Sequence, residues 1–204
     1  MLLACKLLRS LSISVRKTGQ IRNTVLQVVH GDLTLETTHA ISTPHTVNPA
    51  NSELVLGGGV AGAILRKGGS TIQLECSNWT QVHGPVPEGR SAYTCAGKLQ
   101  CKYVIHTVGP RYSGSGSLPT VLLERAVCSA LEQAEALQAV SVSMPAISSG
   151  IFGYPKRKCA ESLMGTAVEW IKAGNQTKLE LLRFVNVDEE TVSHFEAVFD
   201  RFVK

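Results

Sequence analysis

Short apolar runs separated by segments of helical periodicity recur along most of the chain. Buried strands are predicted at residues 25–29, around Val47, and at residues 103–108 (YVIHTV), 139–144 and 179–187. Strands that alternate with helices form sheets covered on both faces, so the pattern predicts a three-layer α/β/α sandwich. Its central sheet is expected to be mixed and mostly parallel.

Apolar side chains at helical spacing predict the helices between these strands. One helix is expected to begin near Val60, and two longer ones cover residues 118–137 and 156–173. Two apolar stripes are expected to face the core. They consist of Leu122, Ala126, Ala130 and Ala134 in the helix at 118–137, and of Val192, Phe195, Phe199 and Phe202 near the C-terminus.

Composition indicates one globular domain. The 204 residues are 44% hydrophobic and 18% charged, which is enough apolar material for a substantial core. We expect a leader or disordered N-terminus at residues 1–10 and a single domain at 11–204. The net charge of +4 favours a phosphorylated ligand, but no Lys/Arg run predicts nucleic-acid binding. No apolar stretch is long enough to predict a transmembrane helix.

The N-terminus has two interpretations. The first 31 residues contain five basic residues and several serines but no acid, a composition typical of an organelle transit peptide. Alternatively, Leu11, Ile13 and Val15 alternate with polar residues as a first strand. Six scattered cysteines without a C-x-x-C pair favour a reducing compartment and predict no metal site. We therefore expect an intracellular protein, cytoplasmic or nuclear, with mitochondrial targeting left open.

Two glycine-rich turns, each between a predicted strand and a predicted helix, carry the candidate chemistry. The first runs from Val47 through VNPAN to Gly57-Gly58-Gly59-Val60, and the second is SSGIFG at residues 148–153. Glycines allow a ligand to approach the backbone, and the start of a helix favours an anion. Together the turns predict a diphosphate clamp. The alternative is that the glycines serve only tight turns. Neither G-x-G-x-x-G nor a Walker A sequence is present.

With these turns, the chain resembles the macro domain family, the ADP-ribose-binding fold, from about Leu11 to Lys204. The matching sequences are GDLT at 31–34, VNPAN at 47–51, GGGV at 57–60, IHTVGP at 105–110 and SSGIFG. Within the family, AGKLQCKYVIHTVGPRY and SSGIFGYPKRKCA look most similar to macro modules of the multi-domain ADP-ribosyltransferases.

The resemblance implies a ligand-binding role for particular residues. The Asp32 carboxylate would accept a hydrogen bond from the adenine amino group, Asn51 would hold the distal ribose, and residues 148–152 would close over the phosphates. The full implied set is Asp32, Leu33, Asn48, Asn51, Gly58, Gly59, Val60, Ser148, Ser149, Gly150, Ile151 and Phe152. Taken singly, Asp32 is equally a helix N-cap, Asn51 a left-handed turn residue and Phe152 a core aromatic.

The resemblance leaves the function open between enzyme and binding module. Hydrolysis of the ester between ADP-ribose and an acidic side chain would use Asn51, Gly59, Gly62 and Phe152. However, Ala61 stands where one hydrolytic subgroup has aspartate. The alternatives are a non-catalytic reader of ADP-ribosylated partners and an O-acyl-ADP-ribose deacylase, with RNA binding as a third class. ADP-ribose is expected as the ligand, with no resident cofactor, and the protein is expected to be a monomer.

The chain departs from the family pattern at three places. About five residues look inserted at 41–46, where Pro44 predicts a bulge or looped excursion that displaces Asn48 and Asn51. Pro49 replaces the usual alanine. Residues 186–188 (NVD) offer no aromatic side chain to stack on adenine, which is expected to cost about 1 kcal/mol of binding free energy.

Overall fold

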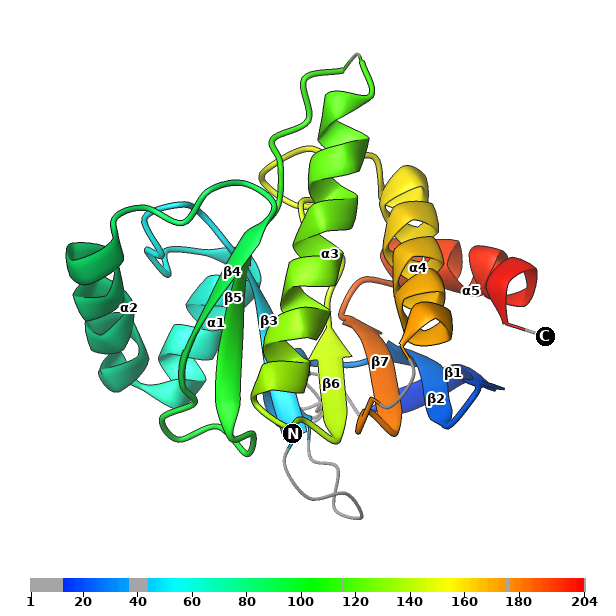
Figure 1. Ribbon diagram of the computed structural model, residues 1–204, viewed down its shortest axis with the longest axis horizontal. Helices are drawn as coiled ribbons and strands as arrows, with labels where there is room; N and C mark the ends of the chain where they lie inside the picture. The colour runs from blue at the N-terminus through cyan, green and yellow to red at the C-terminus, as the bar shows by residue number, and fades with distance from the viewer. Residues whose placement is uncertain (1–12, 37–43, 115, 175–176, 204) are drawn as a thin grey trace, which may run out of the picture.

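The computed structural model describes residues 13–36, 44–114, 116–174 and 177–203. Seven strands form one sheet in the order β1-β2-β7-β6-β3-β5-β4 (Figure 1). The edge pairs β1–β2 and β5–β4 are antiparallel, and all pairs between them are parallel. The strands are β1 (Ser14–Ile21), β2 (Thr24–His30), β3 (Pro44–Ala50), β4 (Arg90–Cys95), β5 (Tyr103–Val108), β6 (Ser141–Met144) and β7 (Leu181–Asn186).

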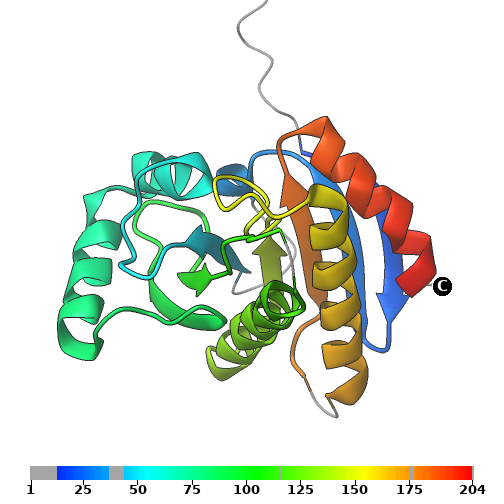
Figure 2. The ribbon, with the colours of Figure 1, turned by 90° about the horizontal axis from the view of Figure 1, so that it is seen from above.

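Within the described ranges, five α-helices cover the two faces of this sheet (Figure 2). They are α1 (Gly59–Gly68), α2 (Ser70–His83), α3 (Leu118–Ala136), α4 (Lys156–Ala173) and α5 (Glu189–Phe202). The last three pack on one face around Phe184, while α1 and α2 pack on the other around Val104. The predicted three-layer α/β/α sandwich with a mixed, mostly parallel sheet is confirmed.

Burial follows the sequence pattern closely in the inner strands. All six residues of β7 are buried, because α5 packs over Phe184 on one face and the turn after β2 covers Arg183 and Val185 on the other. In α3 the buried face is rotated relative to the prediction, since Leu123, Val127 and Leu131 join Ala126, Ala130 and Ala134. Leu122 is only half-buried. The C-terminal stripe is confirmed at Val192, Phe195 and Phe199, whereas Phe202 is partly buried.

The structure corrects the expected excursion before β3. Residues 44–46 belong to a regular strand, since β3 pairs with β5 without a register shift from His45 to Ala50. Pro44 occupies the first strand position, where its missing N–H is tolerated. The predicted bulge is therefore wrong for 44–46, while residues 41–43 lie outside the described residues. The predicted leader at 1–10 also lies outside them.

Two elements were not predicted. Helix α2 has two exposed apolar residues, Leu74 and Val82, so its apolar pattern does not mark one buried face. Strand β4 is short and pairs only with β5 at the sheet edge. At the N-terminus β1 begins at Ser14, but the predicted alternation is wrong at Val15, which is exposed and is followed by a register shift before Lys17. Exposure alternates only from Lys17 to Ile21.

Candidate ligand-binding cleft

A cleft of about 770 Å³ lies across the carboxyl ends of β2, β7, β6, β3 and β5. Ligands of open α/β sheets bind at this edge because loops between strands and helices converge there. Most of its lining comes from five segments, at residues 31–34, 49–51, 57–61, 145–152 and 185–188, with Val55, Ala63, Gly109 and Arg111 in addition. Both glycine-rich turns predicted from the sequence therefore reach one cleft.

Asp32 stands at one end of the cleft, after β2. It is the N-cap of a short 3₁₀ helix (Leu33–Leu35), and its Oδ1 accepts hydrogen bonds from Thr34 N at 2.9 Å and Thr34 Oγ1 at 2.7 Å. The capping interpretation is thus confirmed, and the remaining acceptor sites of the carboxylate are compatible with a ligand as well.

A buried ion pair fixes the turn that carries Asp32. Glu36 Oε2 accepts from Arg183 at 2.5 Å and from Ser143 Oγ at 2.9 Å, which fastens the turn to β7 and β6. Burial raises the pKa of Glu36, although Arg183 and Ser143 act against that shift. The sheet therefore fixes the position of the Asp32 turn through Glu36.

Asn51 shapes the first glycine-rich loop. Its side-chain amide forms two hydrogen bonds with the backbone of Val55, one donated by Nδ2 at 2.9 Å and one accepted by Oδ1 at 3.0 Å. The left-handed non-glycine residue of this loop is Leu54, with φ of 52°, and not Asn51 as one interpretation expected. These two hydrogen bonds fix the shape of the loop.

The first loop ends in backbone amides at the start of α1 that no side chain caps. Gly58 is the N-cap and provides no side-chain hydrogen bond, so the first N–H groups of this ten-residue helix are left for another acceptor. A Cβ built on Gly59, whose φ is +55°, would meet no heavy atom within 4 Å. This stretch of backbone is therefore directly accessible from the cleft.

The second loop faces the first across the cleft. A Cβ on Gly58 would lie 4.0 Å from Cδ1 of Ile151, which is itself 82% exposed. Ser148 adopts φ of 67° and is buried, and its Oγ has no hydrogen-bond partner. A Cβ on Gly109 would come within 2.2 Å of that oxygen, so the strand end beneath the loop requires glycine. The two loops thus converge as a clamp requires.

Phe152 and Arg111 form the far end of the cleft. Phe152 is half-buried and so is not a core aromatic, and the Arg111 guanidinium lies 4.5 Å from its ring centroid. Tyr112 N donates to the Phe152 carbonyl at 2.9 Å, which ties the loop to the segment after β5. Sequence reasoning missed Arg111. Its only signal was its place directly after IHTVGP at a strand end.

The end of β7 contributes polar residues near Asp32. Asn186 Oδ1 accepts from Ala146 N at 3.0 Å, while its buried Nδ2 has no partner. Asp188 caps α5 and pairs with Lys156 at 2.8 Å. Burial acts to raise the pKa of Asp188, but hydrogen bonds from Lys156 and Thr191 hold it below its usual value. Of the described cleft residues, Phe152 alone is aromatic.

Two predicted site residues do not line the cleft. Asn48 is buried in β3, where its Nδ2 donates to His106 Nδ1 at 3.0 Å. Gly62 lies inside α1, and a Cβ there would approach Gly57 O to 3.3 Å, so it allows the first loop to pack on the helix. The other predicted residues, Asp32, Leu33, Asn51, Gly58, Gly59, Val60 and 148–152, all line the cleft.

The cysteines and the possible metal ligands of the described part of the chain are scattered. Its five cysteines are free, and it contains no group of three His, Cys, Asp or Glu residues that could hold a metal. Burial raises the pKa of the Cys76 thiol to about 12. Within these ranges no helix is both long and apolar enough to cross a bilayer.

Comparison with known proteins shows the family to which the fold and its sequence are similar. The family model described as Macro domain matches residues 47–163. An uncharacterized protein of Thermotoga maritima is 45% identical over 91% of this chain, which spans only 30% of that relative. The O-acetyl-ADP-ribose deacetylase of Citrobacter rodentium is 38% identical, with 85% of this chain and 94% of the relative covered. A solved Oceanobacillus iheyensis macrodomain variant with ADPR superimposes with a TM-score of 0.83 at 28% identity, covering 91% and 97%.

Proposed function

The chain belongs to the macro domain family, and we propose that its cleft binds ADP-ribose, both free and attached to protein side chains. The observation that carries this proposal is the convergence of Gly58 and Ile151, which brings both glycine-rich loops to one cleft. Backbone amides at a helix start and in a facing loop suit a diphosphate. The name of the Citrobacter relative and the ligand of the Oceanobacillus variant support the same ligand.

The proposed orientation places adenine at Asp32. Its carboxylate would accept the adenine amino group, and the backbone N–H of Leu33 would add a second contact. The diphosphate would lie between the start of α1 and residues 148–152. Phe152 and Asn51 would border the distal ribose, with Asn51 using the amide N–H and lone pair that Val55 does not occupy.

Calorimetry with Asp32→Ala tests this orientation. A hydrogen bond to a charged group contributes about 1.5–3 kcal/mol, so the substitution is expected to weaken ADP-ribose binding roughly 10- to 100-fold. Asp32→Asn is the matched control, because its amide oxygen can still cap Thr34 and preserve the turn. Equal ADP-ribose affinity in wild type and Asp32→Ala would contradict the placement of adenine. A wild-type affinity for ADP-ribose no better than for AMP would contradict the diphosphate clamp.

A second proposal is that the cleft hydrolyses esters of ADP-ribose. The name of the Citrobacter relative favours an O-acyl-ADP-ribose substrate, and ADP-ribosylated glutamate presents a comparable ester. For the glutamate ester, a water held between the α-phosphate and the anomeric carbon would form a bond to that carbon as its bond to the acyl oxygen breaks, the glutamate carboxylate would leave, and the substrate's phosphate would take the proton of the water. For O-acetyl-ADP-ribose, the water would instead attack the acetyl carbonyl carbon, the bond from that carbon to the ribose oxygen would break, and acetate would leave while the ribose oxygen takes the proton. Asn51, Gly59 and Phe152 would position that water, and Gly62 would act through the packing of the first loop.

Turnover assays separate an enzyme from a reader. Purified protein is incubated with O-acetyl-ADP-ribose and with a peptide mono-ADP-ribosylated on glutamate, and released ADP-ribose is measured. Product from either substrate, reduced in Asn51→Ala, supports hydrolysis. If both substrates bind but neither gives product, the protein is a non-catalytic reader of ADP-ribosylated partners. RNA binding as the main activity would require an affinity for adenine-rich RNA that exceeds the affinity for ADP-ribose.

The proposal also includes predictions about the subfamily, the cellular setting and the oligomeric state. The sequences around IHTVGPRY and SSGIFGYPKRKCA support a relationship to the macro modules of multi-domain ADP-ribosyltransferases, although no transferase is among the relatives named above. Free, scattered cysteines support an intracellular setting. The monomeric state stays a prediction.

A further inference from the structure

Charge is distributed unevenly along the cleft. Of the described residues that line it, Asp32, Asp188 and Arg111 carry charge. The carboxylates follow the neighbouring strands β2 and β7, whereas Arg111 follows β5. Four strand spacings separate β2 from β5, which corresponds to roughly 19 Å. Acidic groups therefore mark one end and a single cation marks the other.

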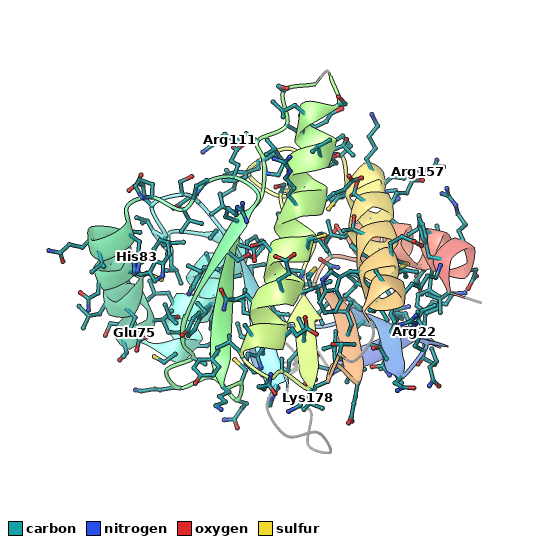
Figure 3. All side chains as sticks on the ribbon, viewed as in Figure 1. Arg22, Glu75, His83, Arg111, Arg157 and Lys178 are labelled. Atoms are coloured by element: carbon teal, nitrogen blue, oxygen red, sulfur yellow. The ribbon has the colours of Figure 1, made fainter. Side chains whose placement is uncertain are left out.

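The Arg111 guanidinium is exposed and has no carboxylate partner among the described residues. The nearby Glu88 accepts only from the backbone N–H of Arg111, at 3.4 Å, and no ion pair in the described ranges includes Arg111. Its one defined side-chain contact is the stacking on Phe152. Figure 3 shows Arg111 at the edge of the sheet where the parallel strands end. The cation is thus held in place but not neutralised.

A ligand with its adenine at Asp32 places its distal ribose, and whatever is attached to it, toward Arg111. The ribose itself carries no negative charge that would complement the guanidinium. The diphosphate lies at the centre of the cleft, opposite the open amides of the two loops. An anion beside Arg111 must therefore come from the group attached to the ribose.

We propose that Arg111 is a specificity-determining residue that selects ADP-ribosylated peptides with acidic residues next to the modified side chain. The inference rests on the proposed function, because it takes the orientation of ADP-ribose from it. Arginine suits this role because its planar guanidinium can stack on Phe152 and still donate to a carboxylate. Exposed pairs of opposite charge are weak, so the preference is modest, about two- to fivefold in affinity.

The test uses two peptides that carry ADP-ribose through the same non-hydrolysable link. Aspartates flank the modified residue in one peptide, and asparagines flank it in the other. For each protein variant the measured quantity is the ratio of the two dissociation constants. Because this ratio is taken within one protein, a general change in ADP-ribose affinity cancels.

Wild type is expected to prefer the acidic peptide two- to fivefold, and the preference should shrink at high salt. Arg111→Gln should bring the ratio to about one, and Arg111→Glu should reverse it. Arg157→Gln is the matched control and should keep the wild-type ratio. Arg157 is exposed on α4, lies 3.5 Å from Glu161, does not line the cleft, and stands well apart from Arg111 (Figure 3).

Any of four results would overturn the inference. A wild-type ratio of one, or an unchanged ratio in Arg111→Gln, shows that Arg111 does not read the acceptor. If Arg111→Gln weakens the binding of both peptides equally, Arg111 acts only by supporting Phe152 or by binding the diphosphate. Absence of free ADP-ribose binding by wild type would instead refute the proposed function, and this inference with it.

Discussion

At the scale of single residues, a buried histidine links protonation to stability. Nδ1 of His106 accepts from Asn48, so the proton of the neutral ring lies on Nε2, which is 2.9 Å from Thr94 Oγ1. Thr94 in turn donates to the Cys95 carbonyl. Every polar atom of the ring is thus paired in its neutral form. Burial lowers the pKa of His106 to about 4, although Glu75 acts against that shift.

This depressed pKa predicts acid sensitivity. Because the unfolded state binds the proton more readily, the stabilisation is complete above the ordinary pKa of about 6.5 and is lost as pH falls toward 4. Between pH 7 and pH 5 the contribution of His106 to the free energy of unfolding is expected to fall by about 2 kcal/mol. Urea unfolding at both pH values measures this change.

His106→Gln provides the control for that prediction. The substitution is expected to lower stability at pH 7 but to remove most of the slope between pH 7 and pH 5. Asp188 does not contribute to this slope, because its lowered pKa places its effect on the free energy of unfolding below this pH range. An undiminished slope in the variant would assign the acid sensitivity to other groups.

At the scale of elements, α1 and the β4–β5 connection meet through two glycines. Gly97 has φ of +56°, and a Cβ there would lie 2.1 Å from the carbonyl oxygen of Gly68 near the end of α1. Lys98 N donates to the same carbonyl at 2.9 Å. The close approach of two backbones fixes α1, and with it the first glycine-rich loop, relative to the sheet.

Gly97→Ala is therefore expected to lower the free energy of unfolding by about 2–4 kcal/mol, measured by urea denaturation. About 1 kcal/mol of this comes from the left-handed backbone, and the remainder from displacement of the Gly68 carbonyl. Gly84→Ala is the matched control, since its φ is +78° but nothing lies within 4 Å of its Cβ. Equal losses in both variants would show that the contact with Gly68 has no energetic importance.

At the scale of the whole molecule, the cleft joins the carboxyl ends of five strands. Ligand binding should therefore stabilise the entire sheet against unfolding. At a concentration 100 times its dissociation constant, ADP-ribose is expected to add about 2.7 kcal/mol, which raises Tm by roughly 5–10 °C. Thermal denaturation with AMP at the same concentration should give a smaller shift, because AMP lacks the diphosphate and distal ribose. An equal shift would contradict the clamp.

The sequence by itself determined most of the elements and the two loops of the cleft. Residues 103–108 and 156–173 have the bounds found in the structure, because apolar periodicity is a local property. The glycine-rich turns and the capping role of Asp32 could also be predicted from the sequence, since glycine and capping residues act over a few neighbouring positions. The short edge strand β4 and helix α2 escaped because neither carries a clear local pattern.

Only the tertiary structure decided which of these parts meet. The sheet order places β6 between β7 and β3, so that Ser148 lies between Asp32 and Asn51 along the cleft. In the same strand order, Asn48 contacts His106 instead of lining the cleft, and Arg111 lies over the ring of Phe152. Pairings between residues 40 or more positions apart depend on strand order and side-chain packing, and no local pattern encodes them.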